Sequence, residues 1–181
     1  MPLVSTRGAA SARASGFLSA GAGVLVGSLC TWGTNTEGEL GILNFTNYSS
    51  PKQVGALTNW SKVSCGYLGK FTIAVKTDGT LWSWGNSILG RAGGTEVTQI
   101  GSATNWRQTD HGIQTAGAIT TDGKLYTWGY SGYHGLGNTS NYADSVQQVG
   151  SATDWIYYRA GGSGALGIRG TTYGGGGALY T

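Results

Sequence analysis

Two phrases recur in fixed order along this 181-residue chain, and the repetition constrains its fold more than any other feature. The first phrase reads KTDGTLWSWG from residue 76 and TTDGKLYTWG from residue 120, a spacing of 120 − 76 = 44 residues. Copies of a second phrase alternate with it, reading QVGALTNW, QIGSATNW and QVGSATDW from residues 53, 99 and 148. A tandem array with a period of about 45 residues predicts a repeat architecture.

Each unit has the pattern of a small antiparallel sheet. An Asp-Gly pair, Asp78-Gly79 in one unit, stands between apolar alternations and predicts a two-residue hairpin turn, because Asp-Gly accepts positive backbone dihedrals. The alternation places Ile73 and Val75 on one face of a strand and the small Ala74 on the other. No segment sustains the 3.6-residue apolar period of a helix. We therefore predict an all-β fold.

The stretch LYTWGYSGYHGLGNTSNYADSVQQVGSATDW, residues 125–155, resembles the regulator-of-chromosome-condensation repeat. The resemblance extends over roughly residues 19–181, with three full units that start near Leu29, Leu81 and Leu125. That family forms β-propellers, usually of about seven blades. The resemblance therefore implies an incomplete or small β-propeller of about three to four antiparallel blades. The founding member of the family binds chromatin and promotes nucleotide exchange on a small GTPase, but the present chain has no motif for either activity, and we expect neither.

Two fragments flank the full units. Ser19–Val26 resembles the closing strand of a unit, and Thr171–Thr181 resembles the start of another. The fragments either pair with each other as a thin fourth blade or leave open edges that pair with another copy of the chain. We favour the intermolecular contact, because the second fragment lacks the Trp-Gly of a complete strand.

The chain has few charges. Charged residues make up 10% of it, against about 25% in an ordinary soluble domain. Such a surface is either covered by neighbouring subunits or is the neutral polar surface of a Gly-rich, Ser-rich repeat protein. The net charge is +3 and the basic residues form no stripe, so we expect no nucleic-acid partner. No apolar run has the length of a membrane span.

Residues 1–18 lie outside the repeats and predict an extended N-terminal assembly arm, followed by the repeat domain, residues 19–181. The segment GAASARASGF resembles a stretch found in structural proteins of tailed bacteriophages. An apolar run after it suggests a signal peptide, but three glycines interrupt that run, and we expect the arm to be retained. Within the arm, Arg7, Arg13 and Phe17 are candidate partner-binding residues.

Residues that carry chemistry are scarce. Cys30 and Cys65 are 65 − 30 = 35 residues apart without a CxxC motif, which argues against a metal site. We expect both to be small buried residues, with a disulfide between them as the lesser alternative. No Ser-His-Asp order or paired carboxylates are recognisable, so we predict no enzyme activity and no cofactor.

Aromatic residues are the remaining candidates for binding. Tyr130, Tyr133 and His134 cluster in the phrase YSGYHG and are candidate partner-binding residues, because exposed aromatic side chains in loops anchor proteins or stack on sugars. The tryptophans of the repeated phrase are instead expected to pack between blades: Trp32, Trp84 and Trp128.

These features predict a structural component of a bacteriophage virion, either a capsid decoration protein or part of a tail or fibre appendage. Its expected partners are other virion proteins and further copies of itself, and its expected location is the virion. The alternative is a secreted or surface-exposed propeller that acts as a lectin-like adhesin, with a host-surface glycan as its ligand.

Overall fold

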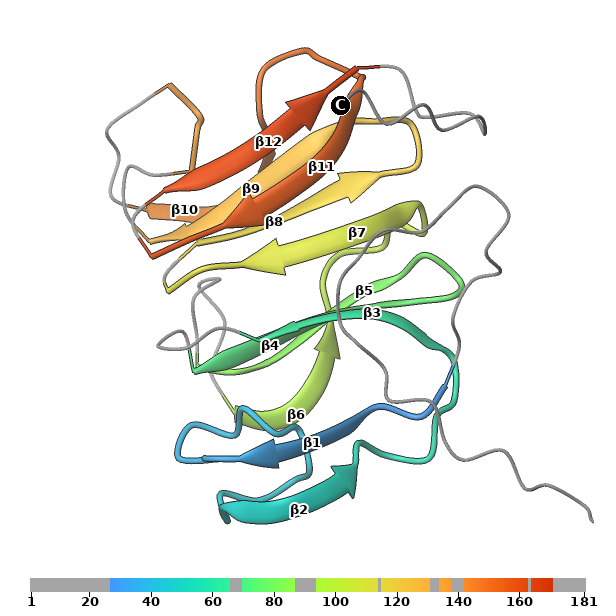
Figure 1. The fold of residues 1–181 in the computed structure, drawn as a ribbon, viewed down its shortest axis with the longest axis vertical. Helices are drawn as coiled ribbons and strands as arrows, with labels where there is room; N and C mark the ends of the chain where they lie inside the picture. Colours follow the sequence, from blue (N-terminus) through green and yellow to red (C-terminus); the bar gives the residue numbers. More distant parts are fainter. Residues whose placement is uncertain are drawn as a thin grey trace, which may run out of the picture. The chain divides into compact units, whose positions relative to one another are not determined.

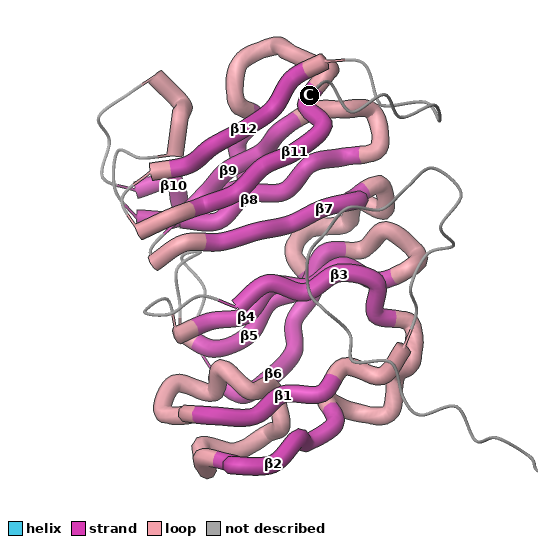
Figure 2. The backbone as a smooth tube through the Cα atoms, viewed as in Figure 1, coloured by secondary structure: helices cyan, strands magenta, loops and turns pink. Residues whose placement is uncertain are grey.

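The structure is a computed structural model. It describes residues 27–65, 70–86, 94–113, 115–130, 134–137, 142–162 and 164–170. All of these fall within one compact unit of the chain, Val24–Thr172. Regular structure in the described residues is entirely β-strand, as predicted (Figure 2). They include no helix of the length and apolarity that crossing a membrane requires.

The described residues form twelve strands in four antiparallel sheets, in the order β1-β2, β3-β4-β5-β6, β7-β8-β9-β10 and β11-β12. The strands of the first two sheets are β1 Cys30–Gly33, β2 Tyr48–Gln53, β3 Trp60–Cys65, β4 Phe71–Lys76, β5 Leu81–Gly85 and β6 Gly94–Gln99. Those of the last two are β7 Trp106–His111, β8 Thr115–Thr120, β9 Leu125–Tyr130, β10 Tyr142–Gln148, β11 Trp155–Ala160 and β12 Ala165–Arg169. Successive sheets lie next to one another in chain order (Figure 1).

Each two-stranded sheet corresponds to one half of a four-stranded sheet. In β1-β2, Cys30 pairs with Gln53, as Trp82 of β5 pairs with Gln99 of β6. The pair β1-β2 therefore corresponds to the last two strands of a four-stranded sheet. In β11-β12, Ala160 pairs with Ala165. In the same way Cys65, the last residue of β3, pairs with Thr72, the second residue of β4. The pair β11-β12 therefore corresponds to the first two strands of such a sheet.

The Asp-Gly hairpins have a different turn from the predicted one. The Gly79 N–H donates to the Lys76 carbonyl, and the Lys76 N–H donates to the Thr80 carbonyl, both at 3.0 Å. Gly79 has φ +76°, whereas Asp78 has no positive φ. The turn is therefore a three-residue type I turn that ends in a left-handed glycine, not a two-residue turn. The Asp78 carboxylate instead accepts the Thr80 N–H at 3.0 Å.

Apolar side chains fill the spaces between neighbouring sheets. The two faces of β4 serve different cores, as the alternation predicts: Ile73 and Val75 pack toward Trp106 and Trp128, whereas Ala74 packs with the other group. That other group joins the first two sheets, and its buried members are Leu29, Val54, Trp60, Ala74 and Trp84. A third core, with buried Ile119, Leu125 and Tyr158, joins the last two sheets. Each core is completed by two sheets, which makes the fold an incomplete β-propeller.

Candidate protein-interaction surfaces

The loop between β1 and β2, residues 34–47, is organised around one buried amide. Asn35 is fully buried. Its Oδ1 accepts the Leu40 N–H at 2.9 Å, and its Nδ2 donates to the Asn44 carbonyl at 2.6 Å. The backbone N–H of Asn35 donates to Oδ1 of Asn47 at 2.7 Å. Because one side chain bonds to distant parts of the loop, the loop has a fixed conformation before any partner binds.

The tip of this loop exposes two large apolar side chains. Leu43 is 74% exposed and Phe45 is 61% exposed. Leu43 has φ +61°, a left-handed conformation that a leucine rarely adopts. Asn44, between them, accepts the Thr46 N–H through its Oδ1 at 2.9 Å. The loop therefore holds Leu43 outward in an unfavourable backbone geometry, and such strain occurs most often at functional sites.

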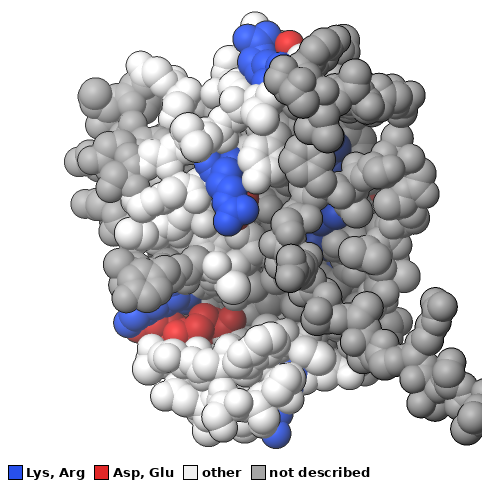
Figure 3. All heavy atoms as spheres, viewed as in Figure 1, with Lys and Arg blue, Asp and Glu red and all other residues white. Residues whose placement is uncertain are grey.

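Charged side chains around this loop are engaged in local contacts. Glu37 is engaged by the Lys70 ammonium at 3.2 Å, and the Glu39 carboxylate accepts the Glu37 N–H at 2.7 Å. The Lys52 ammonium lies 5.0 Å from the centre of the Tyr48 ring. The described part of the face in Figure 3 is mostly neutral. A surface of this kind suits an apolar, weakly charged partner.

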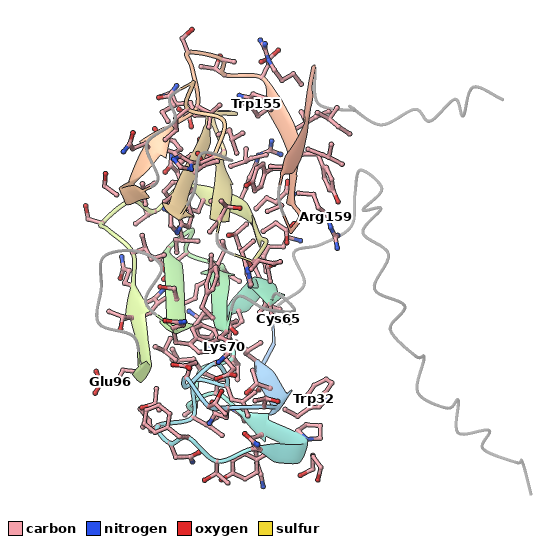
Figure 4. All side chains as sticks on the ribbon, turned by 90° about the vertical axis from the view of Figure 1, so that its left-hand side faces the viewer. Trp32, Cys65, Lys70, Glu96, Trp155 and Arg159 are labelled. Carbon is pink, nitrogen blue, oxygen red and sulfur yellow. The ribbon has the colours of Figure 1, made fainter. Side chains whose placement is uncertain are left out.

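A second set of polar contacts ties the sheets together through Asp110 of β7. Its Oδ1 accepts the Ser64 hydroxyl of β3 at 2.6 Å, and its Oδ2 accepts the Ala160 N–H of β11 at 3.0 Å. The Arg159 guanidinium, labelled in Figure 4, lies 3.7 Å from Oδ2 and is largely exposed. One carboxylate thus bridges three successive sheets, and its bonding capacity is used for structure.

Two neighbouring residues of β7 also bond to β11. The Gln108 amide donates to the Tyr158 carbonyl at 2.9 Å, and the Arg107 guanidinium donates to the Trp155 carbonyl. Burial lowers the pKa of Arg107 and raises the pKa of the Tyr158 hydroxyl. The Gln108 and Arg107 side chains thus tie β7 to β11.

Most of the site residues that the sequence predicts lie outside the described part of the structure. Arg7, Arg13, Phe17 and Tyr133 lie outside the described residues. Tyr130 ends β9, and its side chain is also outside the described part. His134 is buried rather than exposed, and its carbonyl accepts the Thr127 hydroxyl at 2.7 Å. The described structure therefore does not present this imidazole to a partner.

Three further expectations about burial need correction. Cys30 and Cys65 were expected to be buried, but both are free thiols and exposed. Among the described residues, no further sheet covers these two positions, whereas a neighbouring sheet covers the equivalent positions in the other repeats. Trp84 and Trp128 pack between sheets as predicted, but Trp32 is 60% exposed and projects outward from β1 (Figure 4). The prediction of a packed Trp32 is wrong for the described structure.

Leu43, Phe45 and Asp110 are the residues that sequence reasoning missed. The segment ILNF around Leu43 does break the polar character of a loop, which is a signal that could have been noticed. Asp110 carries no local signal, because its partners are 46 and 50 residues away in the sequence. No cluster of metal-ligating side chains was found among the described residues.

Antiparallel four-stranded sheets that follow one another and share cores define this chain as an array of β-propeller blades. Two stretches, residues 26–75 and residues 60–91, match the model of the regulator of chromosome condensation (RCC1) repeat. Residues 26–91 are therefore similar to RCC1 repeats.

The chain is similar to part of two larger proteins. The chain is 34% identical over 125 residues to the human E3 ubiquitin-protein ligase HERC2, an alignment that covers 64% of this chain and 3% of HERC2. It is 35% identical over 132 residues to the mitochondrial RCC1 domain-containing protein RUG3 of Arabidopsis thaliana, which covers 63% of this chain and 29% of RUG3. The chain thus spans a small part of each relative.

A solved structure has the same fold. The chain superposes on Prp20p from Saccharomyces cerevisiae with a TM-score of 0.67 and 17% sequence identity. The superposition covers 80% of this chain and 40% of Prp20p. This likeness supports the propeller fold.

Proposed function

We propose that this chain is a protein-interaction module whose partner binds the loop of residues 34–47. The observation that carries the proposal is the outward display of Leu43 and Phe45 on a loop fixed by the buried Asn35. A rigid apolar anchor loses little conformational entropy on binding, which favours affinity. The solved structure of Prp20p is described together with its binding to Gsp1p and histones, so a propeller of this fold can have protein ligands.

A photo-crosslinking amino acid at position 45 tests this proposal. We expect crosslinks from position 45 to one protein species in extracts of the source, and none from the matched position 57, where Leu57 is also exposed. Leu43→Ser should weaken the crosslinking at least about tenfold if Leu43 anchors the partner. Equal crosslinking from positions 45 and 57 would contradict the proposal.

We further propose that the partner belongs to a virion, with this chain as a decoration or appendage subunit. The low charge of the chain and the resemblance of its residues 8–17 to phage structural proteins support this assignment. A chain that lacks residues 1–17 should fold but fail to enter the particle. Normal incorporation of the shortened chain would remove the anchoring role of the arm.

The lectin-like alternative has its own readout. A glycan array probed with the full chain should remain blank if the virion proposal is correct. Binding to one glycan class that does not depend on Phe45 would favour the adhesin.

A further inference from the structure

We propose that β11-β12 of one copy and β1-β2 of a second copy join edge to edge into one four-stranded blade. This inference goes beyond the proposed function, because it concerns the two ends of the described repeat array rather than Leu43 and Phe45. Among the described residues, β12 has β11 on one edge and no strand on the other. Likewise β1 has β2 on one edge and no strand on the other.

The two half-blades are complementary in strand content. Within the complete sheets, the second strand pairs with the third, as β4 pairs with β5. The sheet β11-β12 has the first two strands of this pattern, and β1-β2 has the last two. A second copy therefore supplies the missing half at either end.

The register of this junction follows from the complete blade. Ile73 of β4 pairs with Ser83 of β5, and Val75 pairs with Leu81. In β12, Leu166 and Ile168 stand at the positions of Ile73 and Val75. Thr31 and Leu29 stand at the positions of Ser83 and Leu81. The same register therefore places Leu166 of one copy opposite Thr31 of the other, and Ile168 opposite Leu29. Leu166 is 77% exposed, whereas Ile73 at the equivalent position is fully buried. The junction would thus bury an apolar row that the described structure leaves in solvent.

A tryptophan contact gives independent support. The Trp84 indole packs on Gly41, where an added Cβ would lie 2.7 Å from its Nε1. The same Nε1–H donates to the Glu39 carbonyl at 2.9 Å. Gly41 thus provides the space that the tryptophan of the following blade fills, and its φ of +65° favours glycine.

The junction between copies would complete a second contact of this kind. Gly137 occupies the position of Gly41, since both stand nine residues after their repeat tryptophan, Trp128 and Trp32. Gly137 has φ +73° and no atom within 4 Å of an added Cβ. Trp32, the counterpart of Trp84, is exposed. In the joined blade, Trp32 of one copy packs on Gly137 of the other.

Blade number explains why the partner is a second copy. The described residues of one copy form two complete blades and two halves, the equivalent of three blades. Propellers close with about four to eight blades. The described blades of one copy are fewer than that, whereas those of two copies, about six, are enough for a ring.

Sedimentation of the full chain tests the junction. We expect the wild-type chain to sediment as a dimer, that is, with twice the 18.7 kDa mass of one chain. Leu166→Lys should weaken association at least about tenfold, because a lysine on a joined edge buries its charge. Leu57→Lys, a matched substitution of another exposed leucine, should leave the dimer intact.

Cysteine pairs test the register. In a Cys30→Ser, Cys65→Ser background, Thr31→Cys with Leu166→Cys should form a disulfide-linked dimer, because directly paired Cα atoms lie about 4.5–5.5 Å apart. Thr31→Cys with Ile168→Cys is out of register, with positions about 7–8 Å apart, and should crosslink far less. A monomeric wild-type chain would overturn the proposal, including one closed by its own residues 171–181. A dimer that survives Leu166→Lys without in-register crosslinks would overturn it as well.

Discussion

Trp32 and Trp84 occupy the same position in two repeats, yet only one of them is packed. Trp84 is 4% exposed and donates a hydrogen bond to the Glu39 carbonyl. Trp32 has no sheet over it among the described residues. The contribution of a repeat residue to stability therefore depends on whether the neighbouring blade is present, and not on the repeat motif alone.

A matched pair of substitutions measures this difference. In dilute protein, Trp84→Ala should lower the free energy of unfolding by about 3–5 kcal/mol, because it opens a cavity between sheets. Trp32→Ala should change it by no more than about 0.5 kcal/mol, as an exposed position does. Chemical denaturation of both variants provides the measurement. Equal losses would mean that Trp32 is covered within a single chain.

His111 gives stability a pH dependence. The side chain is buried against Phe71, with ring centroids 4.1 Å apart, and its Nδ1 lies 2.8 Å from the Gly112 carbonyl oxygen. Burial lowers the pKa of His111 below its usual 6.5. In the unfolded chain His111 therefore takes up a proton near pH 6.5, whereas in the folded chain it does so only at lower pH. The contribution of the neutral His111 to the free energy of unfolding is fully present above pH 6.5 and is lost as the pH decreases below it.

His111→Phe should flatten this dependence while keeping the ring contact. We expect the denaturation midpoint of the wild-type chain to fall between pH 7 and about pH 5, and that of the variant to fall less. Asp78 titrates at lower pH, because hydrogen bonds from Thr80 hold the pKa of its carboxyl below the usual value. The two effects therefore occupy different pH windows. Identical slopes in both proteins would refute the role of His111.

At the scale of elements, the hairpin glycines join one blade to the next. The Gly79 carbonyl accepts the Trp106 N–H at 3.0 Å, which links the β4-β5 turn to the start of β7. A Cβ at Gly79 would lie 2.0 Å from the Thr104 carbonyl oxygen. The Asp-Gly phrase therefore recurs both because it turns the chain and because the next unit packs directly on its glycine.

Two glycine substitutions separate these causes. Gly55→Ala places an alanine at φ +58° with open space around it and should cost about 1–2 kcal/mol from backbone strain alone. Gly79→Ala adds the clash with Thr104 and should cost clearly more than Gly55→Ala. Thermal or denaturant unfolding of the two variants provides the comparison. Equal costs would show that the contact between blades contributes nothing at this turn.

Much of this level of structure could be predicted from the sequence. The alternation of Ile73, Ala74 and Val75 gave their faces correctly, because strand periodicity is a local property. Packing across 46 to 50 residues was not predictable, so the bridging role of Asp110 was missed. The exposure of Trp32 was mispredicted for the same reason, since its motif does not say whether another sheet follows.

At the scale of the whole molecule, the described repeats form an array with two complementary half-blades. Its interior polar residues, above all Asp110, are used to hold successive sheets together. The most exposed of its large apolar side chains, Leu43 and Leu166, lie on the loop of residues 34–47 and on β12. Other exposed ones are Trp32, Phe45, Leu57, Val63, Tyr157 and Ile168. This division places binding at loops and edges and leaves the blades as a scaffold, which agrees with the use of repeat folds as interaction surfaces.

Amide hydrogen exchange of β12 at several protein concentrations tests most directly whether the half-blades are joined between copies. We predict that the amides of Ala165–Arg169 that do not bond to β11 exchange slowly at high concentration and fast after dilution, while β4, inside a complete blade, stays slow throughout. Fast exchange of β12 at every concentration would contradict the account, because the edge would then be free. Slow exchange at every concentration would contradict it too, because the chain would then close the edge by itself.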